Sequence, residues 1–220
     1  IPKELEKLSL DKAKITTIKI KNATAATYLN ADNWATLRSY FTSNSGWDRL
    51  TTLDLSQSTL HTITKPSPVS PSTNLITVLL PNTLVEIGPQ AFYSCPNLVR
   101  VELPANLKTI GSQAFLYCPK LDLTKLPDRV ETIEANAFAD MTQLSLERLP
   151  NSLKTIGEGA FLRCANLQLT ELPRNIQTIG NAALQGCTRL SITKLPDGIT
   201  KLDSNVFHGC TGLTEMELPA

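Results

Sequence analysis

Apolar and polar positions along this chain repeat with a step of 23 residues. Equivalent positions of successive repeats form columns, and separate columns hold leucine, isoleucine, alanine and phenylalanine. The unit reads C-x-x-L-x-x-h-x-L-P-x-x-h-x-x-I-G-x-x-A-F, where h is aliphatic. A repeat of this length is the signature of a solenoid, in which each small unit packs on the next and all share one core. The proline column is the most regular, at Pro81, Pro104, Pro127, Pro150, Pro173, Pro196 and Pro219.

Each unit is expected to contribute one strand to a parallel sheet and a short helical turn opposite it. Segment 98–103 alternates as a strand does, and Pro104 ends it because proline lacks the N–H that a ladder needs. Segment 107–110 is expected to turn the chain back over the core. The glycine after it suits a tight turn, but Glu134 and Asp203 occupy the same column, so a positive φ is not required there. The residues from this column to the cysteine column are expected to form one or two turns of α or 3₁₀ helix.

Two versions of the strand segment occur. The units that begin at Leu75, Leu98 and Leu213 read L-x-x-V/M-x-L-P. Because side chains alternate along a strand, moving the central apolar residue by one position changes which side chains face outward. We therefore predict a local bulge or shift in the units of the second version, L-x-L/I-x-x-L-P, which begin at Leu121, Leu144, Leu167 and Leu190.

The N-terminal part of the chain departs from the repeat. We expect a cap over residues 1–48, followed by one continuous solenoid over 49–220 whose first repeat, 49–71, is irregular. Such a cap is needed because the first unit would otherwise expose apolar core. The chain starts without methionine or a signal peptide and stops just after a strand and its proline, which suggests a processed or trimmed fragment. The natural protein is then expected to continue, or another chain, including a second copy, to cover the open edge.

Within this N-terminal part, the pattern predicts a strand at 16–20 and a helix over 30–42. A second strand is predicted at 50–55, with an irregular turn at 60–63. The predicted helix carries its apolar side chains at helical spacing on one face, at Trp34, Leu37 and Phe41.

Charge and composition exclude several classes of protein. Lysine and arginine number 21 and aspartate and glutamate 20, so the net charge of +1 gives no basis for nucleic-acid binding or a polybasic membrane patch. The apolar runs are far shorter than the ~20 residues of a membrane span. The 41% of hydrophobic residues is too high for a disordered chain.

The cysteines form one column of the repeat, which Met141 completes. A disulfide or metal framework is the functional alternative, since neighbouring units would bring two sulfurs close. Five is an odd number, however, and no C-x-x-C spacing occurs, so buried structural thiols are the favoured interpretation. The column comprises Cys95, Cys118, Cys164, Cys187 and Cys210.

Catalytic and metal-binding patterns are absent from the sequence. The two histidines, His61 and His208, belong to no H-E-x-x-H motif, and no G-x-S-x-G motif is present. Glu102 could form a glycosidase-like pair with an acid of a neighbouring unit, but the next unit places Lys125 beside it, which favours a surface ion pair. We predict no catalytic residue, no metal and no cofactor, and we keep a hydrolase as the third alternative.

The column just before Leu-Pro is the most informative surface. Its side chains should project from the exposed side of the sheet, with mixed signs that permit cross-strand ion pairs. A solvated, self-neutralising face is one interpretation and a binding face the other, and the lack of tryptophan and tyrosine argues against stacking of sugars. The candidate partner-binding residues in and beside this column are Arg100, Glu102, Asp122, Lys125, Glu147, Arg148, Gln168, Glu171, Lys194 and Glu217.

The unit, with Leu-Pro and Ile-Gly-x-x-Ala-Phe-x-x-Cys, resembles the BspA-like class of bacterial leucine-rich repeats over about residues 49–220. The resemblance implies an α/β repeat fold: a right-handed leucine-rich-repeat solenoid with a parallel sheet on one face and short helical or 3₁₀ turns on the other. It also implies a non-enzymatic, extracellular or surface-attached protein that adheres to host or other cell-surface proteins. A rigid spacer that presents another domain is the alternative.

Overall fold

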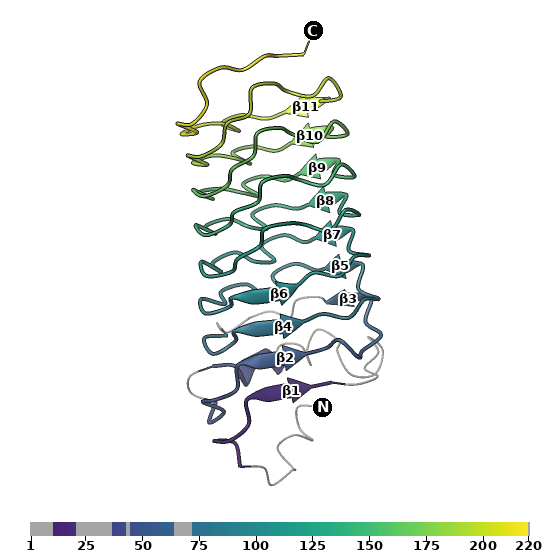
Figure 1. Cartoon of the computed structure of the whole chain (residues 1–220), viewed down its shortest axis with the longest axis vertical. Helices are drawn as coiled ribbons and strands as arrows, with labels where there is room; N and C mark the ends of the chain where they lie inside the picture. Colours follow the sequence, from purple (N-terminus) through teal and green to yellow (C-terminus); the bar gives the residue numbers. More distant parts are fainter. Residues whose placement is uncertain (1–10, 21–36, 43–44, 64–71, 220) are drawn as a thin grey trace.

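The chain forms a parallel β-solenoid in which successive units stack along one axis, as the computed structural model shows (Figure 1). β1 and β11 lie at opposite ends of the stack. Strands of neighbouring units pair in parallel and in register at the step of the repeat, as in Thr109↔Thr132 and Ile110↔Ile133. The structure describes residues 11–20, 37–42, 45–63 and 72–219.

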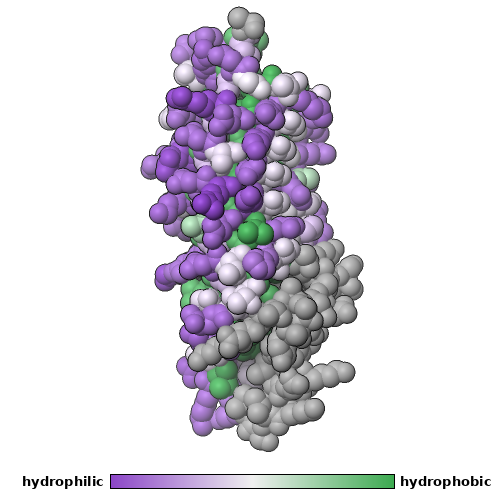
Figure 2. All heavy atoms as spheres, turned by 90° about the vertical axis from the view of Figure 1, so that its right-hand side faces the viewer, coloured by the Kyte–Doolittle hydropathy of each residue, from purple (hydrophilic) through white to green (hydrophobic). Residues whose placement is uncertain are grey.

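A seven-stranded sheet runs the length of the array, in the order β11-β10-β9-β8-β7-β5-β3. In most of its strands a half-buried threonine precedes a buried isoleucine, because successive side chains point to opposite faces. Figure 2 shows this side of the molecule as largely hydrophilic. The strands are β3 (Thr62–Ile63), β5 (Glu86–Ile87), β7 (Thr109–Ile110), β8 (Thr132–Ile133), β9 (Thr155–Ile156), β10 (Thr178–Ile179) and β11 (Lys201–Leu202).

Two predictions about the segments of this sheet were wrong. Segments 60–63 and 107–110 were predicted to be turns, yet they contain β3 and β7. A strand of two residues is too short to show an alternating pattern. The signal that was available is the β-branched Thr-Ile pair, which favours strands.

A second, four-stranded sheet covers only the first units, in the order β1-β2-β4-β6. The strands predicted at 16–20, 50–55 and 98–103 are confirmed within it. Its strands are β1 (Thr17–Lys19), β2 (Thr52–Asp54), β4 (Thr77–Leu79) and β6 (Arg100–Glu102).

The four-stranded sheet ends where the strand segment changes version. In β6, buried Val101 lies between two exposed residues, as alternation requires. In the next unit two exposed residues, Thr124 and Lys125, separate buried Leu123 from buried Leu126, and no strand forms there. The change was therefore predicted at the right place, but its effect is larger than a bulge. Within residues 121–219 this column keeps only the bridge between Lys194 and Glu217.

The helical turns predicted opposite the strands do not form in the regular units, described over 72–219. Two left-handed residues interrupt each of these turns. The first column comprises Gln90, Gln113, Asn136, Gly159, Ala182 and Asn205, and the second comprises Ser94, Tyr117, Asp140, Arg163, Gly186 and Gly209.

The N–H groups that a helix would satisfy internally bond to the next unit instead. Gln113 N–H donates to Ala135 O and Phe115 N–H to Ala137 O, each at 2.8 Å. The same bonds recur along the array, so the turn side is also hydrogen bonded from unit to unit. Most of the left-handed positions hold side chains other than glycine, so the residue types gave no sign of them.

Stacked columns of identical side chains form the core. Phe92, Phe115, Phe138 and Phe161 are all fully buried, with successive ring centroids 5.3, 5.5 and 5.5 Å apart. The planes of the two central rings differ by only 1°. Because each unit repeats the same contact, the core is continuous along the array.

Close packing between units leaves no room for a Cβ at Gly111 and Gly180, although Glu134 and Asp203 occupy the same column in other units. A Cβ at Gly111 would lie 2.6 Å from the backbone of Gly88, and one at Gly180 would lie 2.6 Å from the backbone of Glu158. Neither glycine is among the residues with positive φ, so the prediction that this column does not require one is confirmed.

Arg38 joins the N-terminal part to the first regular units. Its side chain is 1% exposed, and the guanidinium donates to Ser72 Oγ at 3.1 Å and to Tyr93 O at 2.6 Å. It also lies 3.3 Å from Gln90 O and 3.4 Å from Cys95 Sγ. Arginine side chains are almost never buried without partners, and here the partners come from two segments of the chain, at residue 72 and at residues 90–95.

The rest of the predicted helix over 30–42 is described only from residue 37. Leu37 and Phe41 are buried, as predicted, and residues 37–39 are helical. Trp34 lies outside the described residues.

Candidate protein-binding face

The ten residues predicted to form a partner-binding surface are all exposed, and we call them the charged face. They follow one column of the solenoid, from β6 to the bridge at Lys194 and Glu217. The step of the repeat therefore brings side chains from six units to one side of the molecule.

Ion pairs neutralise part of the charged face. Arg100 pairs with Glu102 within β6, in place of the predicted pair between Glu102 and Lys125. Lys194 Nζ lies 3.3 Å from Glu217 Oε1. These pairs are exposed and contribute ~0–1 kcal/mol each, so they do not fix the face rigidly.

Other charges of the face keep no strong partner. Arg148 lies 3.9 Å from Asp128, and Ser145 Oγ donates to Asp122 at 3.4 Å. Among the described residues, Lys125 makes neither an ion pair nor a side-chain hydrogen bond. The middle of the face can therefore take a charged partner without first breaking a strong internal pair.

A hollow opens in this face beside β6, where the four-stranded sheet ends. Its volume is about 690 Å³, and it is lined by Val101 to Leu103, Ala105, residues 122–129 and Arg148. Sequence reasoning missed the hollow, although the change of strand version between the units at Leu98 and Leu121 marks its place. Four residues of the charged face line it: Glu102, Asp122, Lys125 and Arg148.

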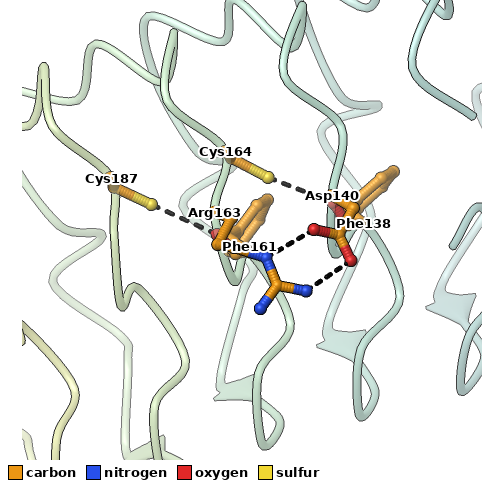
Figure 3. Close-up of polar contacts among 6 residues, drawn as sticks. All are labelled: Phe138, Asp140, Phe161, Arg163, Cys164 and Cys187. Atoms are coloured by element: carbon orange, nitrogen blue, oxygen red, sulfur yellow. Dashed lines mark hydrogen bonds and ion pairs between the residues drawn. The ribbon is translucent and has the colours of Figure 1, made fainter. Parts of the chain in front are cut away.

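The cysteine column has the buried structural role that the sequence predicted. Cys164 Sγ donates to Phe138 O at 3.0 Å and Cys187 Sγ to Phe161 O at 3.2 Å (Figure 3). Cys118 and Cys210 make the same bond to the preceding turns. Each of these four thiols thus donates a hydrogen bond to a carbonyl of the phenylalanine column, in which Leu184 takes the place of phenylalanine for Cys210.

The repeat model described as BspA type Leucine rich repeat region matches this chain in 6 copies, at residues 67–190 and 132–220. The chain belongs to the BspA-type leucine-rich-repeat family. No curated protein sequence matches it.

Solved structures of leucine-rich-repeat proteins resemble the chain. A leucine-rich-repeat protein of T. pallidum is 34% identical, with a TM-score of 0.59 over 70% of this chain and 72% of that one. A leucine-rich-repeat protein of Bacteroides ovatus is 24% identical, with a TM-score of 0.64 over 77% of this chain and 46% of that one. The first supports the family assignment, and the second supports the fold alone.

Both histidines are exposed, and His61 Nδ1 lies 3.1 Å from Thr83 O. Within the part of the chain that the structure describes, no three His, Cys, Asp or Glu side chains lie together as metal ligands would, and no helix has the length and apolarity of a membrane span.

The thiols of the column differ in pKa. Burial raises the pKa of Cys164 well above its usual value and that of Cys187 to about 12, because the protein interior disfavours a thiolate. Burial would raise the pKa of Cys95 as well, but the hydrogen bond from Cys118 and the Arg38 guanidinium lower it to about 7.

The raised thiols predict a loss of stability in alkali. Cys187 stays protonated in the folded state up to about pH 12, whereas in the unfolded chain it ionises near 9.0. Above pH 9 the folded state therefore binds more protons, and the free energy of unfolding falls by ~1.4 kcal/mol for each pH unit that this thiol spans. Urea denaturation at pH 8 and pH 10 measures the fall, with Cys187→Ala as the matched variant. The variant should lose ~1 kcal/mol less than the parent over this interval, and equal losses would contradict the assignment.

Proposed function

We propose that this chain is a non-enzymatic, protein-binding module of an exported or cell-surface bacterial protein, and that its charged face contacts the partner. Adhesion to host or other cell-surface proteins is the role that the family favours. The proposal includes the division of the chain into a cap over 1–48 and a solenoid over 49–220.

The hollow beside β6 is the observation that carries the proposal. Solenoids use extended surfaces to bind partners, and a regular array offers the same surface at every unit. Here the four-stranded sheet ends at β6, and four exposed charged side chains of the face line the hollow beside it. Concave sites with a few convergent polar groups are where proteins bind ligands by preference.

A rigid spacer is the second candidate. The seven-stranded sheet and the hydrogen bonds of the turn side connect every regular unit to the next. Such an array holds its two ends at a fixed separation, which is what a spacer requires.

Binding of the purified chain to immobilised extracellular-matrix and plasma proteins tests the two candidates. Saturable binding is expected, and Lys125→Glu with Arg148→Glu should weaken it by about tenfold, since a like charge is placed against the partner. Lys108→Glu is the matched control, because Lys108 is an exposed lysine next to β7 in the other sheet. Equal weakening by the control would move the site away from the charged face, and absence of binding throughout would favour the spacer.

A further inference from the structure

We propose that the free edge of β6 binds an extended peptide segment of the partner protein as an added strand in the hollow, with an acidic side chain of that segment on Lys125. This inference rests on the proposed function, because it specifies how the charged face would hold a protein partner.

The backbone of β6 presents unpaired groups on the side of the hollow. Arg100 N–H donates to Ile76 O at 3.1 Å, on the side of β4. Since successive residues of a strand direct their backbone groups to opposite edges, the N–H and C=O of Val101 point to the other edge. On that edge a single weak backbone hydrogen bond joins the segment before β6 to the next unit, from Asp122 N–H to Val99 O at 3.4 Å.

Val101 itself connects this edge to the hollow. Its side chain belongs to the core, and the residue is also among those that line the hollow. No backbone hydrogen bond between Val101 and residues 122–126 is present in this described part of the chain. An unpaired strand edge of this kind is a template for another strand.

The chain turns away from this edge because of its own sequence. In segment 121–126, the pattern of buried Leu123 followed by exposed Thr124 and Lys125 is incompatible with a strand in register with β6. This segment lies next to β6 without pairing with it as a strand, and both line the hollow of about 690 Å³.

The charges of the hollow indicate which segment fits. Glu102 is engaged by Arg100, and Asp122 accepts a hydrogen bond from Ser145. Arg148 is held only loosely by Asp128, at 3.9 Å. Lys125 is the charged lining residue with no partner among the described residues. An acidic side chain in the bound segment would therefore gain more binding free energy beside Lys125 than beside the other charges of the hollow.

Selection from a library of random seven-residue peptides, displayed on phage and panned on the immobilised full chain, supplies the probe. Enriched peptides that carry an acidic residue are expected. Synthetic versions in which one backbone amide at a time is N-methylated then report the binding mode. Methylation at alternate positions should weaken binding at least tenfold and leave the positions between nearly unchanged, because only alternate amides face β6. A side-chain-only contact would show no such alternation and would overturn the inference.

Two variants of the protein complete the test. The first variant carries four substitutions, Asp122→Val/Leu123→Arg/Thr124→Val/Lys125→Glu. They give the unit that begins at Leu121 the strand pattern of 99–102, so that this segment pairs with β6 and fills the hollow. This variant should lose peptide binding while its circular dichroism and thermal unfolding stay those of a folded solenoid. If it does not fold, Lys125→Glu replaces it: this change should weaken the acidic peptide about tenfold, and a peptide with lysine in place of the acid should recover the loss. Lys108→Glu should change neither affinity.

The outcomes separate this inference from the proposed function. If no peptide is enriched, or if the filled variant still binds, the strand-addition inference is wrong. Protein binding that depends on Lys125 and Arg148 would then leave the proposed function standing. If peptides bind with the alternating pattern while no protein of the panel binds, the edge site stands and the adhesive role fails.

Discussion

Phe138→Ala is expected to lower the free energy of unfolding by ~3–5 kcal/mol, through lost burial and the cavity left behind. Phe138 is fully buried, and its ring stacks between those of Phe115 and Phe161 with both centroids 5.5 Å away. The two neighbouring units are held at a fixed spacing by ladders on either side of the core, so the cavity cannot collapse by moving the backbone. Urea denaturation followed by far-ultraviolet circular dichroism measures the change.

The phenylalanine column itself provides a control for Phe138→Ala. Leu184 occupies the position of the phenylalanine in its own unit and is fully buried. Phe138→Leu should therefore cost much less than Phe138→Ala, since the array already accommodates leucine there. Cys118→Ala should also cost less, because it removes only a small group and one weak hydrogen bond. Equal losses in all three variants would contradict the cavity argument.

Arg38→Ala is expected to destabilise the protein by a similar amount, ~3–5 kcal/mol, because it leaves several buried hydrogen-bond acceptors without their donor. The guanidinium contacts Ser72 Oγ, Tyr93 O and the Cys95 thiol, and all lose a donor together. The loss should concentrate in the units nearest Arg38, which hydrogen exchange resolves residue by residue.

An exposed arginine provides the comparison for this variant. Arg163 makes two hydrogen bonds to Asp140, at 2.5 and 2.7 Å, but its side chain is 59% exposed (Figure 3). Arg163→Ala should cost only ~0–1 kcal/mol. A second readout is specific to Arg38: without its charge, the pKa of Cys95 should rise from about 7, which alkylation of the thiol as a function of pH measures. An unchanged pKa would mean that Arg38 does not act on the thiol.

The amino-acid sequence by itself determined the stacking. The 23-residue step identified the solenoid and the buried columns and placed the charged face on the surface, and the local pattern of apolar residues identified the strands at 16–20, 50–55 and 98–103. These features follow from which side chains are buried, and burial is what a periodic pattern of apolar residues records directly.

Only the tertiary structure decided how the backbone is paired. In place of the predicted helical turns, the structure has turns with left-handed residues such as Gln113 and Tyr117. The short Thr-Ile segments, predicted as turns, form strands of the seven-stranded sheet. The edge of β6 and the network of Arg38 were equally unforeseen. In each case the backbone or buried polar groups find their partners in another unit or segment, such as Gln113 N–H on Ala135 O. A repeat pattern shows that the units stack, whereas the orientation of each N–H and C=O is fixed only once the neighbouring unit is in place.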